Sequence, residues 1–425
     1  MPASTNAVTT GAPVRRTLLR TFSALRVANY RRYAVGQAVS LSGTWMQRVA
    51  QAWLVLELGG SGTDVGVVTG LQFLPLLLLG AWGGVVVDRV DKRRLLVATQ
   101  SASAVLALVL GVLTATGTVR LWMVMVLATG LGFAHLLDVP ARQSFVIEMV
   151  GPGELTNAVT LNSVTVNAAR MLGPALAGVL IATTGIAVCF LLNAASYLVV
   201  IVAFAGMRSE DLQPSNRMAR GPGQLRQGLA YAWREPALRA PLVLMAVVGG
   251  LAYEFQVILP LLARFSFDGG AGTYGAMTAA MGLGAVVAGL VLAGRHRTGP
   301  RSLARSAYVF GGLILVTAAA PTLELAMVAL VGVGAASIAF LALGNSALQL
   351  AAAPEMRGRV MALWSIAFLG TTPIGGPLVG WVGGQLGPRA GLALGGLATI
   401  VAAALLARGD LASGGVETAP VPTPA

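Results

Sequence analysis

The sequence predicts an all-α integral membrane protein with twelve transmembrane helices in two pseudo-symmetric six-helix bundles. Its 425 residues are 56% hydrophobic and only 11% charged, and the mean hydropathy is +0.77. About a quarter of an ordinary soluble domain is charged, so this chain has too few charges to cover a water-facing surface. Apolar runs recur from residue 33 to residue 407. Their length excludes the short alternating strands of a membrane β-barrel and leaves helices.

Each bilayer crossing takes roughly 20 apolar residues of helix, because the hydrocarbon core is about 30 Å thick. Twelve runs meet or approach that length, and they cover residues 33–57, 64–87, 95–117, 121–140, 156–182, 185–206, 241–263, 270–294, 304–320, 324–350, 359–384 and 388–407. We expect each run to form one spanning helix.

The runs divide the chain into five parts. These are a cytoplasmic tail over 1–32, a six-helix bundle over 33–206, a cytoplasmic linker over 207–240, a second six-helix bundle over 241–407, and a disordered cytoplasmic tail over 408–425. The linker begins with helix breakers and continues with an amphipathic stretch, Leu225 to Trp233. We expect that stretch to be a surface helix on the inner face.

The positions of Arg and Lys predict the orientation, because cationic loops are retained on the cytoplasmic side. With the N-terminus inside, 24 of the 29 Arg and Lys residues fall in cytoplasmic segments. The protein is therefore expected in the plasma (inner) membrane with both termini cytoplasmic. The net charge of +13 then favours anionic membrane lipids as partners. No basic stripe is interleaved with exposed aromatic residues, so nucleic acid is not an expected partner.

Several enzyme classes lack their residues in this sequence. The one lysine, Lys92, stands in Val-Asp-Lys-Arg, so no phosphate-binding loop ending in Gly-Lys-Ser/Thr exists. The two histidines, His135 and His296, are far apart, and Cys189 stands alone. No Gly-x-Ser-x-Gly elbow occurs. We therefore expect no catalytic residues, no metal site and no cofactor.

A repeated pattern indicates that the two halves are related. Pro152, Glu154, Asn157 and the pair Gly173-Pro174 recur in the second half as Pro354, Glu355, Arg359 and the pair Gly376-Pro377. A duplicated six-helix unit is typical of transporters whose site lies between the halves.

The loop after the second run combines a carboxylate with a cluster of cations. It reads Gly84-Val-Val-Val-Asp88-Arg89-Val-Asp91-Lys92-Arg93-Arg94. The cations hold the loop in the cytoplasm, and Asp88 could accept hydrogen bonds from the amino end of the eleventh run, which starts on the same face. Such a latch at the cytoplasmic gate would favour the state closed on the inner side. The alternative is an ordinary positive-inside loop, which explains the cations but neither Gly84 nor Asp88.

This loop resembles the signature of the major facilitator superfamily, Gly-x-x-x-Asp-Arg-x-Gly-Arg-Lys. Gly84, Asp88, Arg89, Lys92 and Arg93 match it, and Asp91 stands in place of the second Gly. Other segments, among them Ser42-Gly-Thr-Trp-Met-Gln47, Pro140-Ala-Arg-Gln143 and Ala169-Arg-Met-Leu-Gly-Pro174, resemble the transmembrane secretion effector branch, which is similar to enterobactin exporters. The likeness runs from about residue 22 to residue 408.

The resemblance implies a monomeric secondary transporter that works by alternating access. It implies a proton-coupled exporter of a small-molecule substrate, such as an amphipathic drug, siderophore or secondary metabolite. Gly173, Pro174 and Gly178 look like the antiporter motif of the fifth span, where a kink and close helix contact would seal the path. A packing kink is the alternative. Gly130-Leu-Gly132 lacks the preceding Arg of many proton-coupled drug exporters, so their proton scheme is not transferred. An importer, a lysophospholipid flippase and a transporter-like sensor or receptor stay as alternatives.

Polar residues within the runs are the candidates for the substrate cavity, because charges are costly in lipid. Gln47, Arg48 and Gln51 share a stripe on the first run, and Asn167 and Arg170 share one on the fifth.

Glu254 lies at a similar depth in the seventh run. One hypothesis is a Glu254–Arg48 pair in which protonation of Glu254 releases Arg48 for an anionic or polar substrate. A static pair, a polar contact within one half and a position at the outer interface are the alternatives. His135 and Asp138 form a second candidate proton relay, near the inner end of the fourth run. They could instead satisfy a carbonyl and cap a helix.

Overall fold

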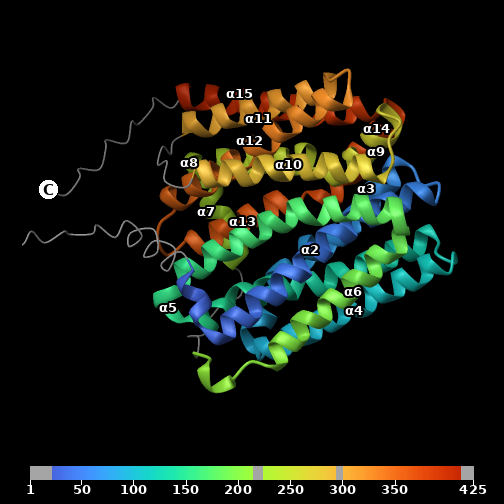
Figure 1. Ribbon diagram of the computed structural model, residues 1–425. Helices are drawn as coiled ribbons and strands as arrows, with labels where there is room; N and C mark the ends of the chain where they lie inside the picture. Colours follow the sequence, from blue (N-terminus) through green and yellow to red (C-terminus); the bar gives the residue numbers. More distant parts are fainter. Residues whose placement is uncertain (1–21, 214–223, 293–299, 413–425) are drawn as a thin grey trace, which may run out of the picture.

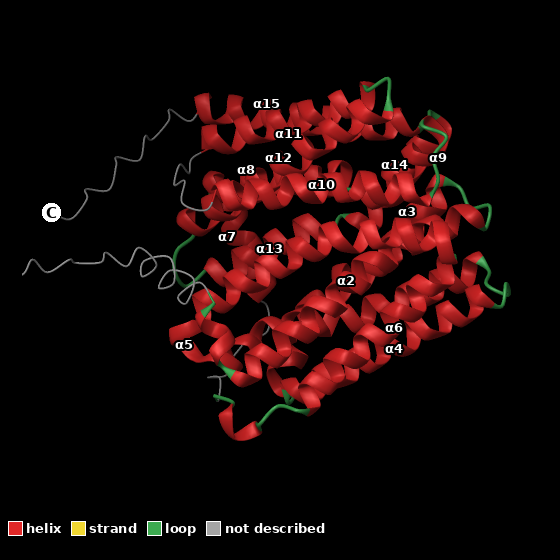
Figure 2. Ribbon diagram, viewed as in Figure 1, coloured by secondary structure: helices red, strands yellow, loops and turns green. Residues whose placement is uncertain are grey.

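The structure is a computed structural model, and it describes residues 22–213, 224–292 and 300–412. The predicted tails and the breaker-rich start of the linker lie largely outside the described residues. Within these ranges every regular element is a helix (Figure 2). The helices are η1 Ser23–Arg26, α2 Ala28–Glu57, α3 Gly62–Arg89, α4 Lys92–Ala115, α5 Leu121–Thr184, α6 Ile186–Ala205, η2 Ser209–Asp211, α7 Gln224–Arg234, α8 Pro236–Val247, η3 Val248–Ala252, α9 Phe255–Ser266, α10 Ala271–Leu292, α11 Pro300–Ala319, α12 Leu323–Ala351, α13 Arg357–Leu369, α14 Thr372–Gln385 and α15 Pro388–Ala412.

Ten helical stretches of the described chain are long and apolar enough to cross a bilayer. The first run is not among them, since α2 carries many polar residues over Ala28–Glu57. The 64-residue α5 counts once, although its length far exceeds one crossing. The chain is therefore a multi-pass membrane protein in which length and composition alone do not fix the number of spans.

The element α5 consists of two helices that meet at a kink at Gly151, where the sequence predicted a loop between residues 140 and 156. Only Gly151 departs from helical geometry, with φ 69° and ψ 178°. Such a positive φ suits glycine, and Pro152 directly after it is pre-set to start a new helical turn. The expected loop is thus reduced to one kinked residue, because the polar segment forms helix on both sides of Gly151.

The helices fall into an earlier and a later group along the chain (Figure 1). Helix α2 packs against α5 and α6, and α4 also packs against α5 and α6. In the later group, α12 packs against α10 and α11, and α11 packs against α15. The groups meet where α3 packs against α14 and where α5 packs against α10.

Two of the later stretches are interrupted, where the sequence predicted continuous spans over 241–263 and 359–384. A π-helical turn, η3, separates α8 from α9, and the pair Gly370-Thr371 separates α13 from α14. The interruptions face each other: a Cβ on Gly249 would lie 2.7 Å from the Phe368 carbonyl oxygen. The two glycines of η3 thus let the backbones of both stretches approach at their irregular points.

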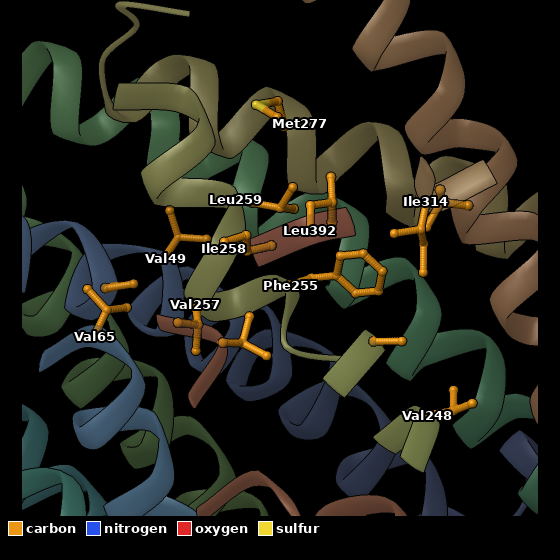
Figure 3. Packing of buried hydrophobic residues seen from close by; sticks show 14 of the residues in the cluster. Val49, Val65, Val248, Phe255, Val257, Ile258, Leu259, Met277, Ile314 and Leu392 are labelled. Atoms are coloured by element: carbon orange, nitrogen blue, oxygen red, sulfur yellow. The ribbon is translucent and has the colours of Figure 1, made fainter. Parts of the chain in front are cut away.

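Helix α9 runs through the largest apolar cluster of the described chain. Figure 3 shows its side chains Phe255, Val257, Ile258 and Leu259 among residues from both groups. The surrounding side chains include Val49 of α2, Val65 of α3, Met277 of α10, Ile314 of α11 and Leu392 of α15. This core holds the irregular segment at the start of α9 in place by packing on all sides.

Helix α7 covers the amphipathic stretch of the linker. Its Ala232 is buried, whereas Leu229 and Trp233 are exposed. It is tied to the start of α13, because Arg359 Nη1 donates to Gln227 Oε1 at 2.9 Å and the Ala353 amide donates to the Tyr231 hydroxyl at 3.2 Å.

Candidate functional site

Two arginines from different helices flank one tryptophan ring between the helices of the earlier group. The Cζ atom of Arg48 lies 4.5 Å from the ring centre of Trp45, and the Cζ of Arg170 lies 5.0 Å from the same centre. Trp45 and Arg48 come from α2, and Arg170 comes from α5. All three side chains are half-buried. We call these three residues the arginine–tryptophan cluster.

The close approach of α5 to α2 at this cluster depends on Gly173. A Cβ at that position would lie 2.6 Å from the Ser42 carbonyl oxygen and 2.6 Å from the Trp45 Cβ. Any side chain larger than hydrogen would push the helices apart. Gly173 thus places Arg170 beside Trp45, and the cluster is a direct result of that glycine.

The buried Nε atoms of both arginines have no hydrogen-bond partner among the described residues. The side-chain ion pairs that the described chain does form are Lys92–Glu148 and Arg142–Asp138. Two like charges therefore lie close together without an acidic partner, which is costly away from water.

The other predicted cavity residues on α2 lie differently. Gln47 is buried, and its Oε1 accepts a hydrogen bond of 2.6 Å from Asn193 Nδ2 of α6. Gln51 is buried as well. Asn167 of α5 is half-buried and donates to its own helix, at 2.9 Å from the Ser163 carbonyl. Gln47 therefore takes part in a contact between α2 and α6. Asn167 instead hydrogen-bonds within α5, the helix that also carries Arg170.

Glu254 stands at the interruption before α9, where it is the residue preceding the first helical turn. Its side chain is 3% exposed, and its Oε1 has no hydrogen-bond partner among the described residues. Thr372 of α14 lies near the carboxylate, and the Oε2 atom faces Gly376. The hypothesised Glu254–Arg48 pair is not formed in this structure, because the break before α9 turns the carboxylate toward α14.

Asp138 is fully buried and has three partners. Its carboxylate accepts hydrogen bonds from Thr99 Oγ1 at 3.0 Å and Gln100 Nε2 at 2.7 Å of α4, and it forms an ion pair with Arg142. It lies within α5 and does not cap a helix. His135, one turn earlier, is half-buried. Asp138 therefore joins α4 to α5, as a fully hydrogen-bonded buried carboxylate.

The loop after α3 is held within the earlier group. Lys92 Nζ bonds Glu148 Oε1 of α5 at 2.5 Å, and Arg93 donates to the carbonyls of Phe204 and Ala205 at the end of α6, at 2.8 Å each. The Asp91 side chain caps α4 by accepting from the Arg94 amide at 2.7 Å. Asp91 thus has a structural role at the position where the family signature carries glycine. The latch between Asp88 and the start of the eleventh run stays a prediction.

The predicted Gly-Pro positions lie where the two groups meet. A Cβ on Gly275 of α10 would lie 2.5 Å from the Pro174 carbonyl oxygen, and one on Gly178 would lie 3.2 Å from the Cα of Gly272. In the second half, a Cβ on Gly376 of α14 would lie 3.0 Å from the Gly66 carbonyl oxygen of α3. Pro377 follows directly and packs at the same place. We call these two backbone contacts the α5–α10 seam and the α3–α14 seam.

Both seams lie toward the same end of the molecule, which carries the loops after α2 and α9 (Figure 1). Gly62 is the first residue of α3 and Gly272 the second of α10, so the contacts begin at the helix ends. Nearer the Gly151 kink of α5, Thr160 and Ser163 are exposed. The helices of the two groups therefore approach closely at one end of the molecule.

Residues 19–421 match the family described as Transmembrane secretion effector. The chain belongs to the transmembrane secretion effector family. Its relatives are membrane transporters of the major facilitator superfamily, and the resemblance of its sequence motifs is thereby confirmed.

Three relatives in this family have named substrates or roles. The chain is 27% identical to the multidrug efflux pump Tap of Mycolicibacterium fortuitum, over 83% of this chain and 87% of that protein. It is 25% identical to the enterobactin exporter EntS of Salmonella choleraesuis, over 81% and 82%. It is 26% identical to the staphyloferrin A transporter of Staphylococcus aureus, over 59% of this chain and 63% of that transporter's length.

The fold of this transmembrane secretion effector is similar to that of the nucleoside transporter NupG. The TM-score is 0.71 at 11% identity, and the match covers 89% of this chain and 98% of that one. At this identity the likeness concerns the fold, which is that of a membrane transporter.

Sequence reasoning missed two contacts of the site. Trp45 could be predicted as a residue of an apolar binding chamber or of the packed core, but not as the ring that both arginines contact; its position three residues before Arg48 on the same helix face was the available signal. Thr372 faces Glu254 because it stands one turn before Gly376 on α14. That contact depends on how α9 and α14 cross, which no local pattern indicates.

Proposed function

We propose that this protein is a proton-coupled exporter of small amphipathic molecules that works by alternating access in the plasma (inner) membrane. The observation that carries the proposal is the arginine–tryptophan cluster, since two half-buried arginines without acidic partners lie within membrane-spanning helices. Charges of this kind mark a substrate path in membrane proteins. The drug and siderophore export of the named relatives supports the direction and the class of substrate.

The proposed architecture has twelve spans in two six-helix bundles, over 33–206 and 241–407, with both termini cytoplasmic. Counting α2 as a span, and α5 as two spans that meet at the Gly151 kink, supports that number. The excess of Arg and Lys in the segments expected inside supports the orientation.

Alternating access would use the two seams. The α5–α10 and α3–α14 seams join the groups at the end that this orientation places outside, so the structure corresponds to a state closed on that side. Opening would separate the backbone contacts at Gly275 and Gly66. The predicted Asp88 latch would then form on the opposite side.

Glu254 is the proposed proton-binding residue. Its carboxylate is buried with one oxygen unpartnered among the described residues, and it lies at the irregular segment between η3 and α9. A carboxylate in this setting is costly when charged and exchanges a proton when water reaches it. Asp138, which has three partners, is a weaker candidate, and among the described contacts no hydrogen bond joins it to His135 one turn away.

The test is transport in proteoliposomes with an imposed pH gradient, acidic inside. An exporter that exchanges protons accumulates an amphipathic dye such as ethidium or 1-naphthoate under this gradient, and an ionophore that collapses the gradient abolishes accumulation. Glu254→Gln is expected to lower gradient-driven uptake at least tenfold. It should leave dye-for-dye exchange without a gradient intact. The matched control is Glu324→Gln, since Glu324 is exposed at the start of α12.

Each result bears on one part of the proposal. Uptake driven only by the opposite gradient would indicate an importer. Full gradient-driven uptake by Glu254→Gln would remove Glu254 from the coupling scheme. A rate of wild-type transport that does not depend on the pH gradient would refute proton coupling.

A further inference from the structure

We propose that the arginine–tryptophan cluster is a binding site for the anionic group of the transported molecule, so that the substrate carries a carboxylate or a similar planar anion. This inference rests on the proposed transport function and names the chemical class of its substrate. It begins from the distances of 4.5 Å and 5.0 Å between the Trp45 ring centre and the two guanidinium carbons, Arg48 Cζ and Arg170 Cζ.

No carboxylate of the described residues pairs with either arginine. Among the described residues, Asp138 and Glu148 pair with other cations, and the Glu254 carboxylate faces α14. A tryptophan face attracts each guanidinium, but such weak contacts do not offset the cost of placing two like charges close together in half-buried positions. A bound anion would remove that cost.

The geometry suits a planar anion. A guanidinium presents N–H donors in a flat fork that matches the two oxygens of a carboxylate. No hydrogen bond joins either guanidinium to a described residue; the Nε atoms of Arg48 and Arg170 are buried, whereas their terminal nitrogens stay accessible. An anion bound at these terminal nitrogens would use donors that no described residue uses.

The surroundings suit an attached aromatic or apolar body. Tyr253 lies near Arg170, and both Tyr253 and Trp45 are half-buried, whereas Tyr197 and Tyr274 near Arg48 are almost fully buried. The accessible parts of the Trp45 and Tyr253 rings are neutral and largely apolar, so they add surface without adding a countercharge. An amphipathic molecule with one acidic end would place its anion at the arginines and its apolar part against these rings.

The experiment compares three probes that share one ring system and differ in charge: 1-naphthoate, 1-naphthalenemethanol and 1-naphthylmethylammonium. Binding to the purified full-length protein in lipid nanodiscs is measured by calorimetry, and empty nanodiscs provide the background. The wild type is expected to bind naphthoate at least tenfold more tightly than the alcohol and to bind the ammonium most weakly. This comparison needs no substitution, so a variant that fails to fold cannot obscure it.

Substitutions test whether the two arginines cause the preference for the anionic probe. Arg48→Gln and Arg170→Gln should each weaken naphthoate binding about tenfold and leave binding of the alcohol unchanged. The matched control is Arg264→Gln, because the Arg264 Cζ lies 5.9 Å from the Trp53 ring centre and 5.7 Å from that of Phe265 at the end of α9, outside the cluster. It should alter no affinity.

Three results would overturn the proposal: no binding of naphthoate, equal affinity for the three probes, or an anion preference that survives both substitutions. The outcome is separable from the fate of the transport proposal. Anion-selective binding by a protein that drives no transport would reject export and keep the site. Gradient-driven transport without anion preference would reject the site and keep export.

Discussion

Substitution of Gly275 by alanine tests whether the α5–α10 seam controls the balance between states. The added Cβ would lie 2.5 Å from the Pro174 carbonyl oxygen and 2.9 Å from the Cα of Gly178. Both are backbone atoms that no side-chain rotation can move. The helices must separate locally, and overpacking of this kind costs about 1–3 kcal/mol.

That cost falls only on the state in which the seam is closed. If the open state has no such contact, the equilibrium between states shifts by the same free energy, which corresponds to about 5-fold to 150-fold toward opening. A protein that is mostly closed at this end should therefore become measurably open.

Pulsed electron paramagnetic resonance measures the shift directly. Spin labels on Thr184→Cys and Gly270→Cys report the separation of the α5 end from the α10 start, since both positions are exposed. Cys189 is buried and can be replaced by alanine to leave no other thiol. Gly275→Ala is expected to add a longer-distance population that the parent lacks.

The matched control is Gly289→Ala in the same helix, where an added Cβ would meet no atom within 4 Å. Both substitutions gain the same helix propensity, so the difference between them isolates the seam. Identical distance distributions for the two variants would refute the reasoning. So would a distribution for Gly275→Ala that matches the parent while its thermal stability is unchanged.

Three further expectations follow from the described contacts. Asp138→Asn should lower the free energy of unfolding by about 3 kcal/mol, measured by thermal unfolding in detergent, because Arg142 would keep its charge without its buried partner; an unchanged melting temperature would contradict this. Gly151→Ala should destabilise the protein by about 1–3 kcal/mol in the same assay, since φ 69° with ψ 178° is a conformation that essentially only glycine adopts; an unchanged melting temperature would contradict this reasoning. Asp88→Cys with Met356→Cys, at the N-terminal boundary of α13, should crosslink only in the state closed on the cytoplasmic side; crosslinking in no state would remove the predicted latch.

Much of the fold could be predicted from the sequence because lipid allows few solutions. Apolar runs of spanning length must be helical, and the described helices follow them closely. The joining of residues 121–184 into α5 could not be predicted, because a polar segment between runs looks the same whether it is a loop or helix. The interruptions at η3 and at Gly370 could not be predicted from the local sequence either. They depend on the close approach of Gly249 in η3 to the end of α13.

The residues of the candidate site could be selected from the sequence, but the directions of their side chains could not. Arg48 and Arg170 could be selected because charges within apolar runs are rare. The stripe on α2 could not show that Gln47 turns to Asn193 of α6, while Arg48, one position later, turns toward α5. Glu254 could be selected in the same way, but its orientation toward Thr372 depends on the π-helical turn before it.

At their closest points the two seams bring backbone against backbone, with Gly178 facing Gly272 and Gly376 facing Gly66. No ion pair of the described residues crosses either seam. Separating the helices there therefore breaks no salt bridge and costs only the packing contacts that the glycines allow. A transporter that must return to its starting conformation in every cycle benefits from such an interface, because an interface joined by salt bridges would hold it in one conformation.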